Sequence, residues 1–134
     1  MTIDSDEIHE PPLPTDAELR ILRVLWDRGP STVREVLDRM PEDRPVGYTT
    51  VLKLLQIMHE KGLVGRDEEG RSHVYSARVA EQRTERRLVS DLIDRAFSGS
   101  AEVLVLRALS ERRASPEELE EIRRLIDRLQ GGGA

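Results

Sequence analysis

Apolar residues recur three or four positions apart in three stretches between residues 15 and 61, which is the spacing of helices with one buried face. Each stretch is bounded by residues that start or stop helices, so the pattern predicts three consecutive helices, the third running over 47–61. The apolar positions are Leu19, Leu22, Leu25 and Trp26 in the first stretch, Val33, Val36, Leu37 and Met40 in the second, and Val51, Leu54, Leu55 and Met58 in the third.

Capping residues mark the ends of these helices. A threonine followed three residues later by a glutamate is typical of a capping box, in which each side chain bonds the backbone N–H of the other residue. Glycine and proline stop helices, the first by adopting positive φ and the second by lacking an N–H. The starts are marked by Thr15 with Glu18 and by Thr32 with Glu35, and the stops by Gly29-Pro30, Pro41 and Gly62.

The pattern changes after Gly62. Residues 63–66 and 71–76 predict two short strands around a turn at 67–70, and hence a hairpin. Three helices followed by one hairpin is the order of a winged helix-turn-helix, with the hairpin as the wing. The alternative is a small three-helix module whose hairpin has no function of its own.

A second set of apolar stretches follows the hairpin. Residues 80–97, 101–110 and a segment beginning at Ser115-Pro116 predict three more helices, with a break at 98–100. Their aliphatic surface is too large for so short a segment to bury alone, so we expect a second copy of the chain to cover it. The expected homodimer contacts are Leu88, Leu92, Phe97, Val103, Leu104, Leu106, Leu119, Ile122 and Ile126.

The predicted fold class is mainly α with a small β-hairpin wing, as a winged helix-turn-helix followed by a C-terminal helical dimerisation region. The first part of the chain is rich in acids and prolines and the last part is rich in glycine, so both are expected to be disordered. The predicted domains are a disordered tail at 1–14, the winged helix-turn-helix at 15–78, the dimerisation domain at 79–130 and a disordered end at 131–134.

The composition narrows the class of protein. The 134 residues include no cysteine, which excludes disulfides, thiolate zinc sites, iron–sulfur clusters and cysteine nucleophiles. No apolar run is long enough to span a membrane, and the acidic N-terminus is unlike a secretory signal, so the expected location is cytoplasmic. The net charge of −5 arises largely from the tail, and the rest of the chain is nearly neutral.

Groups that could carry out catalysis are scarce. The three histidines, His9, His59 and His73, lie in the tail, near a helix end and in the hairpin, and their spacing does not gather metal ligands. The paired glutamates at 117–118 and 120–121 fall on a solvated helix face, and no glycine-rich loop is present to hold a phosphate. The sequence therefore predicts no enzyme, no metal site and no cofactor.

The third helix carries polar residues that suit DNA binding. In a helix-turn-helix the N-terminal part of this helix enters the major groove, where threonine and lysine can contact bases and phosphates. A merely polar helix surface is the alternative, and the position within the motif favours DNA. The predicted DNA-contacting residues are Tyr48, Thr49, Thr50, Lys53 and Gln56 on the helix, with Arg66, Arg71 and His73 on the hairpin.

Several motifs resemble the BlaI/MecI penicillinase-repressor family. The similarity covers about residues 13–130, and its most specific motif is Gly47-Tyr-Thr-Thr-Val-Leu, followed by Lys61-Gly-Leu-Val. The resemblance implies a homodimeric winged-helix repressor that binds a dyad-symmetric operator in double-stranded DNA. It also implies a further partner, a membrane metalloprotease sensor that causes cleavage within the dimerisation region.

The chain departs from this family at two places. Copper-responsive relatives carry a C-terminal cysteine motif, and its absence here excludes that mode of sensing. Relatives that respond to β-lactams are cut between Asn and Phe, and the matching candidate cleavage pair here is Arg107-Ala108. Two other interpretations remain, namely a winged helix that binds proteins and a small-molecule-sensing regulator of the MarR type, which the short acidic N-terminal flank disfavours.

Overall fold

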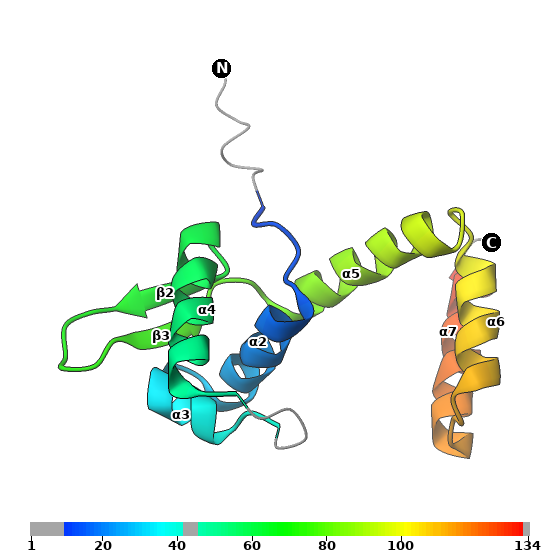
Figure 1. Ribbon diagram of the computed structural model, residues 1–134. Coiled ribbons are helices and arrows are strands. Elements are labelled where there is room, and N and C mark those ends of the chain that lie inside the picture. The colour runs from blue at the N-terminus through cyan, green and yellow to red at the C-terminus, as the bar shows by residue number, and fades with distance from the viewer. Residues whose placement is uncertain (1–9, 42–45, 133–134) are drawn as a thin grey trace. The chain divides into compact units, whose positions relative to one another are not determined.

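The computed structural model describes residues 10–41 and 46–132 and is shown as a ribbon in Figure 1. Within these residues the chain is mainly helical, with one three-stranded antiparallel sheet. It forms two compact units that divide between Leu88 and Val89, inside one helix, and each unit is described by itself. The predicted domain boundary after residue 78 falls earlier, in the loop that precedes this helix.

The first unit contains the predicted series of three helices and a hairpin. This order makes the unit a winged helix-turn-helix, with α3 and α4 as the helix-turn-helix and β2 and β3 as the wing (Figure 1). Pro41, the predicted stop of the second helix, lies within the described residues, and residues 42–45 do not. The elements are α2 (Asp16–Arg28), β1 (Ser31–Thr32), α3 (Val33–Asp38), α4 (Tyr48–Lys61), β2 (Val64–Asp67), β3 (Val74–Ala77) and the first part of α5 (Glu81–Ala96).

Both predicted capping boxes are formed. The Thr15 hydroxyl accepts a hydrogen bond from the Glu18 backbone N–H at 3.2 Å, and the Glu18 carboxylate accepts one from the Thr15 N–H at 3.0 Å. Thr32 and Glu35 make the same pair of bonds at the start of α3. Because the Glu35 carboxylate accepts the Thr32 backbone N–H, the pKa of Glu35 lies below its ordinary value.

The sheet is larger than the predicted hairpin. Its strand order is β1-β3-β2, so Ser31–Thr32 adds a third strand beside β3. A strand of two residues is too short to show an alternating pattern, which is why the sequence does not predict it. The pattern predicts the returning strand at 71–76, whereas it lies at Val74–Ala77, because pairing with Val64–Asp67 sets its register.

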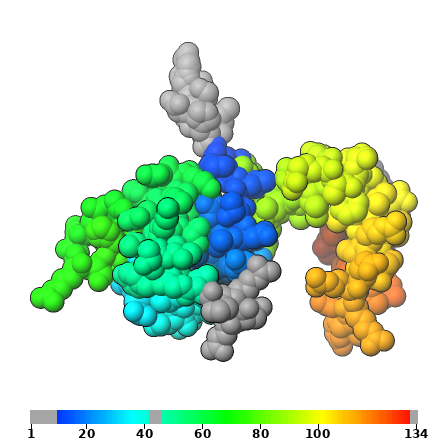
Figure 2. Space-filling model, in the orientation of Figure 1, coloured from blue at the N-terminus to red at the C-terminus, as the bar shows by residue number. Residues whose placement is uncertain are grey.

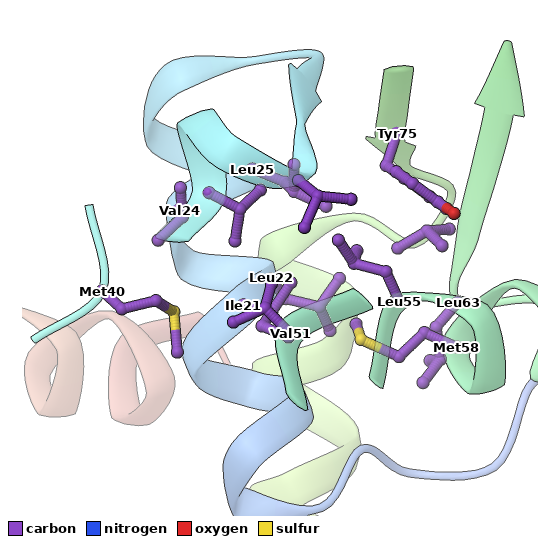
Figure 3. Close-up of a cluster of buried hydrophobic side chains, with 13 residues drawn as sticks. Ile21, Leu22, Val24, Leu25, Met40, Val51, Leu55, Met58, Leu63 and Tyr75 are labelled. Atoms are coloured by element: carbon purple, nitrogen blue, oxygen red, sulfur yellow. The ribbon is translucent and has the colours of Figure 1, made fainter. Parts of the chain in front are cut away.

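The three helices and the sheet enclose one hydrophobic core, drawn in Figure 3. α2 buries more than its predicted stripe, since Ile21 and Val24 are buried as well. A helix that contacts α3, α4 and β3 at once needs a wide apolar face. Trp26 is only half-buried, and its indole N–H donates to the Val79 carbonyl at 2.9 Å. The core residues are Ile21, Leu22, Val24, Leu25, Val33, Val36, Met40, Val51, Leu55, Met58, Leu63, Val64 and Tyr75.

The segment before α2 is held against the first unit from Glu10 onward. Glu10 pairs with Arg83 of α5 at 2.6 Å and with Arg87 at 3.6 Å. The Arg83 guanidinium holds the pKa of the Glu10 carboxyl below its ordinary value. Of the tail that the sequence predicts to be disordered, residues 10–14 belong to the described part of the chain and residues 1–9 lie outside it.

The second unit contains the end of α5, α6 (Ala101–Glu111) and α7 (Pro116–Gly132). Ser98 and Gly99, with φ of 51° and 81°, form the predicted break between α5 and α6. The sequence predicts disorder at 131–134; α7 continues through Gly132, and the last two residues lie outside the described residues. None of the helices in the described ranges is both long and apolar enough to cross a membrane.

Candidate nucleic-acid interface

α4 has two faces of opposite character. Val51, Leu55 and Met58 are fully buried, and their spacing of four and three residues places them on one side of the helix. The core thus holds α4 by its apolar face and leaves hydroxyl, ammonium and amide groups in solvent. All five predicted DNA-contacting residues of this helix are exposed, namely Tyr48, Thr49, Thr50, Lys53 and Gln56.

The first turn of α4 contains no acidic residue. Its N-cap is Gly47, which supplies no side-chain hydrogen bond to the first backbone N–H groups. The last turn carries His59 and Lys61. Because the N-terminal end of a helix is electropositive, an uncapped and acid-free first turn is compatible with a nearby phosphate.

The hairpin projects from the first unit as a narrow wing (Figure 2). Two of its predicted DNA contacts, Arg71 and His73, are exposed. Arg66 differs, because its Nε and Nη2 atoms lie 2.7 and 2.6 Å from one carboxylate oxygen of Glu68. This guanidinium holds the pKa of Glu68 below its ordinary value, so Arg66 is already paired and is less available to DNA than Arg71.

A groove lies between the wing and the helices α3 and α4, and we call it the wing groove. It brings together Tyr48 from α4 with Arg71 and His73 from the hairpin. The other five predicted DNA-contacting residues do not line it. The residues that line the wing groove are Thr32, Val33, Arg34, Tyr48, Leu52, Arg71, Ser72, His73 and Tyr75.

Arg34 of α3 is a site residue that the sequence does not predict. Its guanidinium carbon lies 5.4 Å from the centroid of the Tyr48 ring, which is within the range of a cation–π contact. The only signal in the sequence is a basic residue on the solvent side of α3. That signal is weak, since its partner Tyr48 comes from a different helix and only packing brings the two together.

The residues predicted for dimerisation keep much apolar surface in the single chain. No residue of α6 is buried, and the exposed fraction of Leu106 reaches 57%. Leu92, Val103 and Ile126 are also exposed. Leu88, Phe97, Leu104, Leu119 and Ile122 are half-buried. The candidate cleavage pair, Arg107 and Ala108, is exposed within α6.

A winged helix-turn-helix that turns the polar face of its third helix to solvent defines the class of winged-helix transcriptional regulators. Residues 14–128 match the penicillinase repressor family, and the chain belongs to this family. Members of the family are repressors and not enzymes, so this chain is a DNA-binding repressor rather than a catalyst.

Three known proteins show the extent of the similarity. The penicillinase repressor of Bacillus licheniformis is 24% identical over 113 residues, covering 84% of this chain and 88% of that protein. The transcriptional regulator BlaI of Mycobacterium tuberculosis is 29% identical over 119 residues, covering 87% and 85%. The solution structure of the DNA-binding domain of the repressor BlaI is 26% identical, covers 55% of this chain and 90% of its own, and has a TM-score of 0.48.

Proposed function

We propose that the chain represses transcription by binding a dyad-symmetric operator as a homodimer, with α4 of each subunit in the major groove. The observation that carries this proposal is the exposed face of α4, on which Thr49, Lys53 and Gln56 stand opposite the buried residues. In helix-turn-helix proteins the N-terminal residues of this helix reach the base edges. The similar proteins, one named as a penicillinase repressor and one as a transcriptional regulator, point to the same activity.

Each side chain on this face has a defined chemistry towards DNA. The threonine hydroxyls of Thr49 and Thr50 can bond phosphates or base edges, and their methyl groups fit against the methyl group of thymine. Lys53 can donate to guanine or phosphate, and Gln56 can pair with adenine. Arg71 lies on the wing beside the helix, where it suits the flanking DNA backbone.

The proposed homodimer forms through the second unit. The single chain leaves apolar surface on each of α5, α6 and α7, with Leu92, Leu106 and Leu129 among the exposed residues. A large exposed apolar surface is typical of an interface between proteins. A symmetric dimer covers the same face on both subunits and presents two copies of α4 to the two halves of a dyad-symmetric operator. The proposed location is the cytoplasm, where that DNA lies.

A mobility-shift titration with duplex from the chain's own promoter region tests this function. We expect a complex of two chains on one duplex and a dyad-symmetric footprint with half-sites roughly 10 bp or a multiple apart. Lys53→Ala is expected to weaken binding by roughly 1–3 kcal/mol and to change the base preference at one position of each half-site. Arg95→Ala in the second unit is the matched control, because it also removes one positive charge. It should leave the base preference at each half-site unchanged. A footprint without dyad symmetry, or no complex, contradicts the proposal.

Release from the operator is proposed to follow proteolysis in residues 98–110, with a membrane metalloprotease sensor as the partner that triggers it. Ser98 and Gly99 interrupt the helices at the start of this segment. Arg107 and Ala108 are exposed but lie inside α6. A protease needs an extended chain, so cleavage at this pair requires local unfolding of α6.

A further inference from the structure

The wing groove gathers basic side chains from separate elements of the first unit. Arg34 comes from α3, whereas Arg71 and His73 come from the hairpin, and all three are exposed. Among the residues that the structure describes, no aspartate or glutamate lines the groove. These lining residues therefore present hydrogen-bond donors and positive charge to an incoming anion.

The arginines of the wing groove also differ from nearby arginines in their partners. Arg28 bonds Glu35 at 2.8 Å, and Arg66 bonds Glu68 at 2.6 Å. In the parts of the chain that the structure describes, no ion pair involves Arg34 or Arg71. Two guanidinium groups in one groove thus keep their charge available for an external anion.

Tyr48 holds one of these two guanidinium groups in place. The Arg34 guanidinium lies over the Tyr48 ring at 5.4 Å, and Tyr48 is the first residue of α4. Stacking over a ring occupies the face of the guanidinium and leaves its N–H groups, which lie in its plane, free to donate. A planar fork of N–H donors matches two oxygens of one phosphate. The stack therefore fixes a phosphate-binding group beside the start of the proposed recognition helix.

We propose that the wing groove binds a backbone phosphate of the DNA that α4 reads, with Arg34 as the principal ligand and Tyr48 as the residue that positions it. Arg71 and His73 approach the same phosphate from the wing. This inference rests on the proposed function, because the phosphate belongs to the operator duplex. A phosphate contact adds affinity on every sequence and fixes the position of α4 without reading a base.

The test compares variants of the full-length chain on two duplexes, one from its own promoter region and one with the same base pairs in scrambled order. Arg34→Gln is expected to weaken binding roughly tenfold on both duplexes. It should also make the fall of log affinity with log salt concentration less steep, by about 1 in the slope for each subunit bound. Arg39→Gln is the matched control, because Arg39 is an exposed arginine at the end of α3 that does not line the wing groove, and it should change neither quantity.

Two further variants separate charge from positioning. Arg34→Lys keeps the charge but loses the planar fork, so the salt slope should stay near that of the original chain while affinity falls. Tyr48→Phe keeps the ring under the Arg34 guanidinium and Tyr48→Leu removes it, so Tyr48→Leu should bind more weakly than Tyr48→Phe and should reproduce the affinity loss of Arg34→Lys. Thermal unfolding of each variant shows whether the fold is kept, and Arg34→Lys serves for the comparison if Arg34→Gln is unstable.

The outcomes distinguish this inference from the proposed function. If Arg34→Gln behaves like Arg39→Gln while the original chain binds its promoter, the phosphate site is wrong and the repressor function stands. If Arg34→Gln loses affinity only on the promoter duplex with an unchanged salt slope, Arg34 reads a base and the inference is overturned. If the original chain binds neither duplex, the proposed function itself fails.

Discussion

Among single residues, Glu18 joins two helices of the first unit through one carboxylate. It is 2% exposed, and it accepts hydrogen bonds from the Lys61 ammonium at 2.7 Å and from the Thr15 backbone N–H at 3.0 Å. Glu18→Ala removes both acceptors, leaving the N–H of the N-cap residue Thr15 and the partly buried ammonium of Lys61 without them. We expect the free energy of unfolding to fall by about 2–4 kcal/mol, measured by urea titration followed by circular dichroism.

Two comparisons make this prediction specific to the carboxylate. Glu18→Gln keeps an oxygen for the Thr15 N–H but loses the charge that faces Lys61, so its loss of stability should be smaller. Glu85→Ala removes an exposed carboxylate from α5 and should stay within about 0.5 kcal/mol of the original chain. Equal stability of Glu18→Ala and Glu85→Ala would show that the buried pair does not stabilise the fold.

The residues that the sequence predicts correctly are those with local partners. The Thr15–Glu18 and Thr32–Glu35 capping boxes close over three residues, so their spacing alone identifies them. Exposure of Lys53 follows in the same way from helical periodicity. The Arg34–Tyr48 stack depends on how α3 and α4 pack, and the neutralisation of Arg66 depends on the path of the hairpin. No residue spacing in the sequence carries that information.

Among the elements, α4 has a glycine as the capping residue at each end, and only one of these two glycines has positive φ. Gly62 ends the helix at φ 88°, whereas Gly47 precedes it at φ −91°. A Cβ at Gly62 would make only an ordinary contact with Pro11, so the cost of Gly62→Ala comes from its backbone conformation. We expect a loss of about 1–2 kcal/mol in unfolding free energy by urea titration.

The matched variant at the other end of α4 is Gly47→Ser. Among the described residues, no atom lies within 4 Å of a Cβ at Gly47, and serine adds the side-chain cap that the helix lacks. This change should leave stability equal or higher. Gly62→Asn should lose less than Gly62→Ala, because asparagine tolerates the left-handed conformation. A Gly62→Ala chain as stable as the original would contradict the role of positive φ.

Helices are predicted more accurately than strands in this chain, and the reason lies in their hydrogen bonds. A helix bonds residues four apart, so its limits follow from local residues, as Gly62 shows for α4. A strand bonds a distant partner. The limits of β3 are set by pairing with Val64–Asp67, and β1 exists only because Ser31–Thr32 lies beside β3.

For the whole chain, the exposed apolar surface of the second unit predicts a dimer that single substitutions can weaken. Leu106 is 57% exposed in the single chain, so Leu106→Gln should leave the protomer folded. In a symmetric interface the change occurs twice, and we expect the dimer dissociation constant to rise roughly ten- to a hundredfold. Sedimentation equilibrium measures this, with Glu102→Gln on the same helix as the control. An unchanged dissociation constant for Leu106→Gln would place the interface elsewhere.

The proposed route of derepression predicts how a cut chain behaves on DNA. Dimerisation raises operator affinity because the second half-site is met at high effective concentration once the first is bound. A foreign protease site inserted between Gly99 and Ser100 lies in the break between α5 and α6, and cleavage there separates α6 and α7 from the first unit. Fluorescence anisotropy during digestion should show operator affinity falling by roughly a hundredfold or more, while weak half-site binding through α4 remains.

The same site inserted after Gly132 leaves α5, α6 and α7 intact, so digestion there should leave affinity unchanged. If the chain cut at Gly99 keeps full affinity after its two pieces separate, loss of the dimer is not how this repressor leaves its operator.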